Sequence, residues 1–278
     1  MGLFHFYTKE GKGVEKRELR PVRPLYFFEL FFRKFGKMIQ LNLLYVLMTL
    51  PIWISVFLYI LSDKMLYDPT LVYIGEFISS IGLIFILFSP LIGPATAGAT
   101  YLLRCFSTEM PVFLCAEFFE HFKKNFKQAT LLSIINGLLV LSFSYTIIYG
   151  NEPLFFFGGE TTLSVMQLPL LIVNIIFIFI NYYAYTMMVT FDLKLSAIIK
   201  NSFIFALAKL PLNLFVLVLV SIISYFSFFK PFIGIVLLAL ITYILCGFIV
   251  VFSIYPTIEK HMLIPAQELA KNEENSDI

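Results

Sequence analysis

The chain has 278 residues, of which 59% are hydrophobic and only 14% are charged, and its formal net charge is +2. Charged residues make up about 25% of an average soluble domain, so too few polar side chains remain to cover a water-soluble globule of this size. The composition excludes an ordinary soluble domain and indicates an integral membrane protein. The small net charge also argues against a nucleic-acid-binding protein.

Six apolar segments are long enough to cross a bilayer, which requires roughly 20 apolar residues in a helix. They run over residues 38–61, 72–101, 130–149, 169–190, 210–229 and 232–255. Residues 27–260 then form one membrane domain, between an N-terminal tail (1–26) and a polar C-terminal tail (261–278). We predict an all-α integral membrane protein whose six transmembrane helices form three hairpins.

Basic residues determine the expected orientation, because cytoplasmic loops of membrane proteins are enriched in lysine and arginine. With the six spans above, eighteen of the 20 lysines and arginines fall on one side, and only Lys64 and Lys230 fall on the other. Both termini are therefore expected in the cytoplasm.

Two short blocks of the sequence are similar to each other. Residues 27–37 (FFELFFRKFGK) align with residues 118–128 (FFEHFKKNFKQ), and each block precedes a pair of predicted spans. The connection 191–209 precedes the third pair but matches only weakly. We predict three repeats, each a cytoplasmic amphipathic helix followed by a transmembrane hairpin. The alternative is a chance match, because the chain contains 33 phenylalanines.

The second of these blocks lies in residues 111–129, which have the period of an amphipathic helix. Such a helix lies in the plane of the membrane surface, with its apolar stripe in lipid or against the spans. Its polar side either meets anionic headgroups and water or docks a partner protein. The candidate residues for this contact are Glu120, His121, Lys123, Lys124 and Lys127.

The second predicted span carries the other candidate residues. Glu76 lies near its external end, where it is either an interfacial side chain or a buried relay. Pro90 and Pro94 lack a backbone donor and are expected to kink the helix, while Gly93 permits close approach of another helix. This segment therefore either packs against a neighbour or lines a substrate path.

Neutral polar residues also occur within the predicted spans, namely Asn42, Asn136, Asn174 and Asn181. Each amide can hydrogen-bond to a neighbouring helix, so we expect them to hold helices together.

No catalytic motif is present: the sequence has no nucleophile elbow, HExxH, phosphate-binding loop or paired carboxylates. The three cysteines lack metal-ligand spacing. We therefore expect no enzyme, no cofactor and no metal site.

Three motifs together resemble the YesL family of bacterial integral membrane proteins. They are FFELFFRKFGKMIQLNLLYVLMTLPI, GPATAGATYLLR and FFEHFKKNFKQA. The resemblance implies a six-span helical fold in the bacterial plasma membrane. Members of that family have no known molecular activity, and they are often encoded beside carbohydrate importers of the ATP-binding-cassette (ABC) type.

The resemblance therefore implies a non-enzymatic accessory or regulatory component of oligosaccharide import, with ABC permease or ATPase subunits as partners. The alternative is a transporter in its own right, with the kinked second span lining the path. Recovery of importer subunits with the protein would favour the first hypothesis, and substrate flux in liposomes would favour the second.

Overall fold

The computed structural model describes residues 24–66, 71, 73–77, 89–149, 160–228, 234 and 236–268. All regular structure in these residues is helical. The α-helices are α1 (Pro24–Leu66), α3 (Ile92–Ser107), α4 (Leu114–Lys124), α5 (Phe126–Tyr149), α6 (Glu160–Met188), α7 (Leu195–Ala208), α8 (Leu210–Phe228) and α10 (Tyr243–Ile258). A 3-10 turn, η1 (Ser89–Leu91), precedes α3, and two π-helical segments, η2 (Leu238–Thr242) and η3 (Glu259–Leu263), flank α10.

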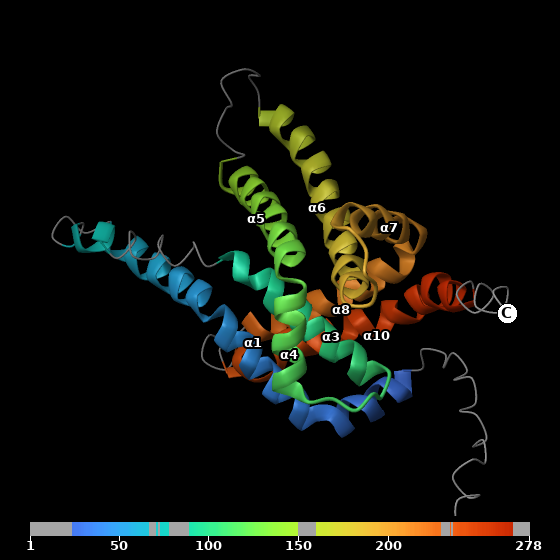
Figure 1. The fold of residues 1–278 in the computed structure, drawn as a ribbon. Coiled ribbons are helices and arrows are strands. Elements are labelled where there is room, and N and C mark those ends of the chain that lie inside the picture. The colour runs from blue at the N-terminus through green and yellow to red at the C-terminus, as the bar shows by residue number, and fades with distance from the viewer. Residues whose placement is uncertain are drawn as a thin grey trace, which may run out of the picture.

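Helix α3 lies at the centre of the molecule, in contact with α1, α4, α5, α6 and α10. Helices α5 and α6 extend side by side away from this centre, and the second half of α1 leaves it in another direction (Figure 1). The largest apolar core joins α1, α3, α4 and α10, and it contains Leu30, Phe106, Phe118 and Phe248.

The small residues of α3 explain its central position. A Cβ on Gly93 would lie 2.0 Å from the backbone oxygen of Ala129 in α5, and a Cβ on Gly98 would lie 2.7 Å from that of Phe118 in α4. Both glycines are buried. The absence of side chains there lets three helix backbones approach one another, which is how small residues act in membrane helices.

A short helix followed by a long one occurs twice in the part of the chain that the structure describes. One residue, Asn125, separates α4 from α5, and one residue, Lys209, separates α7 from α8, which is bent away from α7 by 91°. The side chain of Asn125 donates a hydrogen bond to the carbonyl of His121 at 3.0 Å, which caps the end of α4. The amphipathic helix predicted over residues 111–129 is thus shorter than expected, since its last turn belongs to α5.

The first predicted repeat differs, because its amphipathic block and its span form a single helix, α1. The prediction of a separate helix over residues 27–37 was wrong. The position that aligns with Asn125 is Lys34. Lysine continues a helix well, whereas asparagine favours caps and turns.

The two phenylalanine blocks nevertheless adopt the same side-chain arrangement. The ring centroids of Phe27 and Phe31 are 6.3 Å apart and stacked, as are those of Phe118 and Phe122. All four rings belong to the same apolar core. This equivalence supports the predicted relation between the two blocks.

Three described helical stretches are long and apolar enough to cross a membrane: Leu25–Ser55, Leu171–Met188 and Leu240–Glu268. A fourth is obtained if the bent pair Leu195–Ala208 and Leu210–Phe226 forms one span. These stretches confirm a helical membrane protein. The count of six spans, their hairpin arrangement and the cytoplasmic termini stay predictions, because parts of the segment 72–101 and most of both tails lie outside the described residues.

Three of the four asparagines that were expected to hold helices together do so, namely Asn42, Asn136 and Asn181. The amides of Asn136 in α5 and Asn181 in α6 hydrogen-bond to each other reciprocally, both at 2.9 Å. A residue not singled out from the sequence, Asn213, accepts a hydrogen bond from the Tyr183 hydroxyl at 2.9 Å and donates one to the carbonyl of Ala206. Asn213 belongs to α8, so its side chain connects α8 to both α6 and α7 across the bend at Lys209.

Asn42 of α1 is fully buried, and its side chain binds the backbone around the π-helical segment η2. Its amide donates to the carbonyl of Leu238 at 2.9 Å and accepts from the backbone N–H of Ile244 at 3.0 Å. A π-helical turn shifts the hydrogen-bond ladder by one residue, and Asn42 satisfies backbone groups at both ends of this shift.

Candidate functional site

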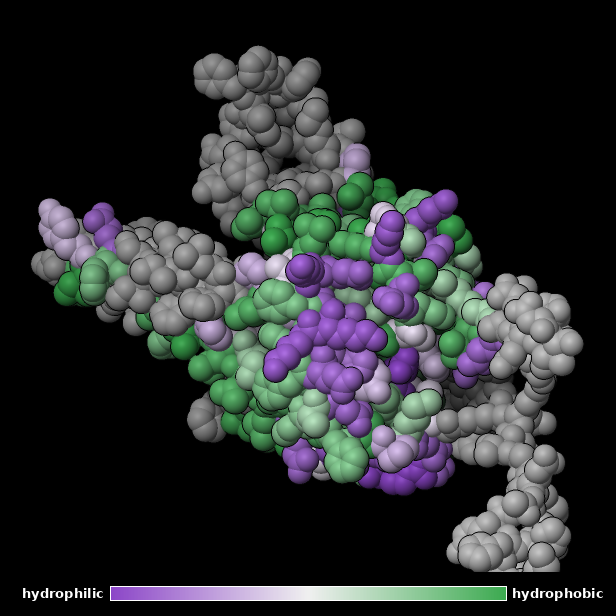
Figure 2. All heavy atoms as spheres, in the orientation of Figure 1, coloured by the Kyte–Doolittle hydropathy of each residue, from purple (hydrophilic) through white to green (hydrophobic). Residues whose placement is uncertain are grey.

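The candidate site is a charged surface over α4. Four of the five candidate residues predicted there, Glu120, Lys123, Lys124 and Lys127, are exposed. Figure 2 shows hydrophilic side chains gathered over α4 and bordered by hydrophobic ones. Glu120, Lys123 and Lys124 belong to α4 and Lys127 to the first turn of α5, and we call these four residues the α4 charged face.

Helix α4 forms at this place because both of its ends are stabilised. The carboxylate of Glu117, in the first turn, accepts a hydrogen bond from the backbone N–H of Phe113 at 2.9 Å. Glu117 stands near the N-terminus and Lys123 and Lys124 near the C-terminus, an order that complements the helix dipole. The helix is short, but its position is fixed because Phe118 is fully buried and its backbone lies against Gly98.

The fifth predicted residue, His121, has a different environment. Its ring stacks on Tyr101 of α3, with centroids 3.4 Å apart, and its side chain is half-buried. Burial lowers the pKa of His121; Glu120 opposes this shift, whereas Lys124 and Arg104 add to it. Its Nδ1 is buried and has no hydrogen-bond partner among the described residues. His121 therefore contributes to the contact between α4 and α3 rather than to the exposed face.

The structure adds Arg104, in the last turn of α3, to this region. Its guanidinium lies 5.0 Å from the ring centroid of Tyr101 and donates to the Val189 carbonyl at 3.3 Å and the Thr190 hydroxyl at 3.0 Å. The amide of Gln128 also donates to the Leu193 carbonyl at 3.1 Å. Residues 189–194, which connect α6 to α7, are thus fixed beside α3 and α5.

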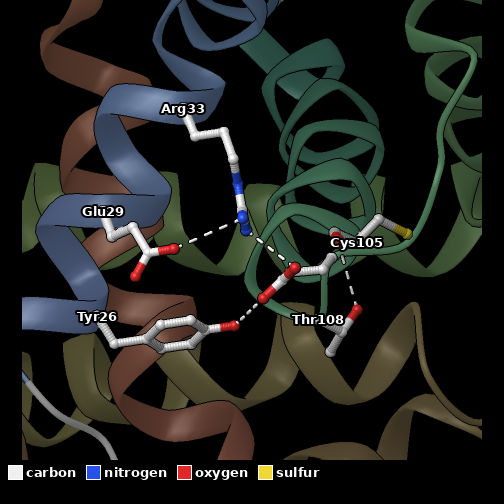
Figure 3. A network of polar contacts seen from close by, with 6 residues as sticks. Tyr26, Glu29, Arg33, Cys105 and Thr108 are labelled. Atoms are coloured by element: carbon white, nitrogen blue, oxygen red, sulfur yellow. Dashed lines mark hydrogen bonds and ion pairs between the residues drawn. The ribbon is translucent and has the colours of Figure 1, made fainter.

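A second polar network fixes the connection between α3 and α4. Figure 3 shows Arg33 and Glu29 on neighbouring turns of α1, together with Tyr26, Cys105 and Thr108. Arg33 forms ion pairs with Glu109 at 2.9 Å and with Glu29 at 3.6 Å. The Tyr26 hydroxyl donates a hydrogen bond to the same Glu109 carboxylate.

Glu109 has a left-handed backbone, with φ of 61°. Its N–H and that of Met110 donate to the carbonyls of Phe106 and Cys105, at 3.3 and 2.9 Å. This is the Schellman ending of an α-helix, where glycine is the usual residue at the left-handed position. The sequence could not indicate this cap because a glutamate occupies that position.

The candidates of the second predicted span lie apart from the α4 charged face. Glu76 is exposed in the short helical stretch 73–77, and Pro90 lies in η1, where its carbonyl accepts from Ser133 of α5 at 3.0 Å. Pro94 is in the first turn of α3, where a missing backbone donor costs no helical hydrogen bond. The kink was expected at Pro90 and Pro94, and the chain does change there from the 3-10 turn η1 to α3; residues 78–88, before this point, lie outside the described residues.

Within the described part of the chain, no group of three or more His, Cys, Asp or Glu side chains could hold a metal ion. The described residues do provide an exposed set of charges on a short helix that is packed firmly against α3. Such a surface can bind another molecule through complementary charge.

These features define the class of the protein as a helical membrane protein with a charged surface formed by a short helix. Residues 38–146 match the model of a family described as a protein of unknown function, DUF624. The matched region runs from Met38 in α1 into α5 and includes α3 and α4. No curated protein and no solved structure matches the chain.

Proposed function

We propose that this protein is a non-enzymatic accessory or regulatory membrane component that binds a partner protein through the α4 charged face. The supporting observation is the combination of exposed charge and fixed support. Glu120, Lys123, Lys124 and Lys127 are exposed, and α4, which carries the first three, is held against α3 by Phe118 and His121. Little conformational freedom has to be lost when such a preorganised surface binds.

The partner that we propose is the permease or the ATPase subunit of a carbohydrate importer of the ABC type, in the bacterial plasma membrane. This choice depends on the resemblance to the YesL family, and the geometry contributes only the binding surface. The three lysines and Glu120 would be complemented by a partner surface that is mainly acidic and has at least one basic residue opposite Glu120. Complementary charges across an interface provide specificity and faster association.

No contact among the described residues favours the alternative that this chain is itself a transporter. Pro90, Gly93 and Pro94 would line the path in that hypothesis, but their contacts have a packing explanation. Gly93 is in close contact with Ala129, and Pro90 accepts a hydrogen bond from Ser133.

The proposed function is tested by purification of the full chain from its native membrane in mild detergent. Importer subunits should be recovered with the wild type. A variant with Lys123→Glu, Lys124→Glu and Lys127→Glu should recover about tenfold less, since each reversed charge turns an attractive contact into a repulsive one. The matched control is Lys200→Glu, an exposed charge reversal in α7, which should leave recovery unchanged.

Oligosaccharide uptake gives the second measurement. Deletion of the gene should slow uptake, and the triple variant should fail to restore it. The proposal is wrong if the protein purifies without importer subunits and its deletion leaves uptake unchanged.

A further inference from the structure

Phe113 lies at the start of α4, and its side chain is 81% exposed. Its neighbours Val112 and Leu114 pack against the largest apolar core. The backbone of Phe113 is extended, with φ of −98° and ψ of 94°, and successive side chains of an extended segment point in opposite directions. The ring of Phe113 therefore points away from the core, while both of its neighbours point toward it.

The backbone that carries this ring is fixed on both sides. Toward α4, the N–H of Phe113 donates to the Glu117 carboxylate at 2.9 Å, and its carbonyl accepts from the Glu117 N–H at 3.0 Å. Toward α3, the carboxylate of Glu109 is held by Arg33 and Tyr26. A large aromatic side chain is thus presented on a preorganised backbone, which reduces the conformational entropy that is lost on binding.

The exposed ring lies beside the α4 charged face. Its backbone contacts with Glu117 place it next to the first turn of α4. Glu120 and Lys124 follow Glu117 by three and seven residues, so they lie on the same side of the helix, and both are exposed. Protein–protein interfaces have this composition, because they combine an apolar centre rich in aromatic residues with a polar rim. A few aromatic side chains then contribute most of the binding energy.

The charges next to Phe113 argue against lipid as its occupant. Phe119, which is 36% exposed, belongs to the apolar stripe of α4. With 3.6 residues per turn, Glu120 and Lys123 separate Phe119 from Glu117 around the exposed side of the helix. Phe113 is therefore not continuous with the stripe that suits acyl chains. Glu117, whose carboxylate binds the backbone of Phe113, also has the same sign of charge as anionic headgroups.

We propose that Phe113 is the apolar anchor of the α4 charged face and inserts into an apolar pocket of a partner protein. The pocket that suits it has a basic side chain opposite Glu120 and acidic side chains opposite Lys123 and Lys124. This inference rests on the proposed function, because the partner is the protein that binds the α4 charged face. Binding then depends on the apolar anchor as well as on charge.

Photo-crosslinking in the native membrane tests the environment of the ring. In the full chain, p-benzoylphenylalanine replaces Phe113, and the irradiated product is identified by mass spectrometry. The adduct should contain the importer subunit that co-purifies with the wild type. It should decrease about tenfold when Lys123→Glu, Lys124→Glu and Lys127→Glu are introduced. The matched control is p-benzoylphenylalanine in place of Phe203 of α7, which is 45% exposed and should give no adduct with that subunit.

Truncation of the ring gives the second measurement. Phe113→Ala should recover about tenfold less of the partner in mild detergent, as for other aromatic anchors. Phe113→Leu keeps an apolar side chain and should recover more than Phe113→Ala. The thermal midpoint of both variants should stay close to that of the wild type, because an exposed side chain contributes little to stability. Phe203→Ala is the control and should leave recovery unchanged.

The remaining outcomes separate the anchor from the proposed function. The anchor is overturned if p-benzoylphenylalanine at position 113 joins only lipid, a different protein or nothing. It is also overturned if Phe113→Ala recovers the partner fully while the triple charge variant loses it, and in that case the proposed function stands. If importer subunits do not co-purify with the wild type, both proposals are wrong.

Discussion

The guanidinium of Arg33 lies 2.9 Å from the carboxylate of Glu109 and connects the start of α1 to the turn between α3 and α4. Glu109 has the left-handed backbone that ends α3. A non-glycine residue in this conformation loses roughly 1–2 kcal/mol. The contacts with Arg33 and Tyr26 offset part of that loss.

The first prediction therefore concerns two substitutions of Glu109. Glu109→Ala keeps the backbone strain and removes both contacts, so the thermal midpoint in detergent should fall by an amount equivalent to about 2–4 kcal/mol. This range combines a half-exposed ion pair, worth about 0.2–1 kcal/mol, with one hydrogen bond to a charged group. Glu109→Gly removes the same contacts but relieves the strain, so it should be less destabilising by about 1 kcal/mol. Equal losses in the two variants would show that the backbone conformation carries no strain.

The second prediction concerns Asn42 and the π-helical segment η2. Asn42→Leu would leave the Leu238 carbonyl and the Ile244 N–H without their partner in a buried site. Each unpaired buried group costs about 1–3 kcal/mol, although partial rearrangement of η2 toward an α-helix reduces the total. We expect a loss of about 2 kcal/mol in thermal unfolding. Leu43→Ala, at the exposed neighbouring position, is the control and should change stability little.

The helices and their asparagine contacts could be predicted from the sequence, because apolar composition and buried amides each have a local chemical consequence. The partners of these amides, which lie far away in the sequence, could not be predicted. The sequence indicates that Asn42 needs a partner, but only the packed structure places it beside residues 238–244, at the far end of the chain.

The positions at which helices end were the least predictable feature of the fold. The two phenylalanine blocks have nearly the same amphipathic pattern, yet α1 runs through its block without interruption and α4 stops at Asn125. A difference of one residue, Lys34 against Asn125, outweighs the shared pattern. Arg104 was likewise missed as a structural residue, because its partners Val189 and Thr190 become neighbours only after folding.

The third prediction compares two glycines that differ in their surroundings. Gly93→Ala would place a methyl group 2.0 Å from the backbone oxygen of Ala129, so α3 and α5 would have to separate. We expect a loss of about 2 kcal/mol or more, as for other overpacked cores. Gly137→Ala in α5 meets nothing within 4 Å, so it should raise stability by about 0.5–1 kcal/mol through helix propensity. Thermal unfolding in detergent measures both, and a stable Gly93→Ala protein would contradict the close packing of α3.

The last prediction concerns pH and His121. The ring stacks on Tyr101 at 3.4 Å, and burial lowers the pKa of His121 below the value of about 6.5 that it has in an unfolded chain. The folded state therefore binds fewer protons at this site than the unfolded state. By linkage, the contribution of neutral His121 to stability is complete above about pH 6.5, and it is lost as the pH falls from there through the folded-state pKa.

The measurement compares the thermal midpoint of the wild type with that of His121→Phe between pH 8 and pH 5. Phenylalanine can keep the stacking contact but cannot bind a proton, so the variant should lose less stability than the wild type as the pH falls. His121→Gln separates the two effects, because it removes the stacking contact and the titration together. It should be less stable than the wild type at pH 8 and should have the same shallow pH dependence as His121→Phe. If all three proteins respond equally to acid, His121 is already accessible to protons in the folded state, and its contact with Tyr101 does not control the pH dependence of stability.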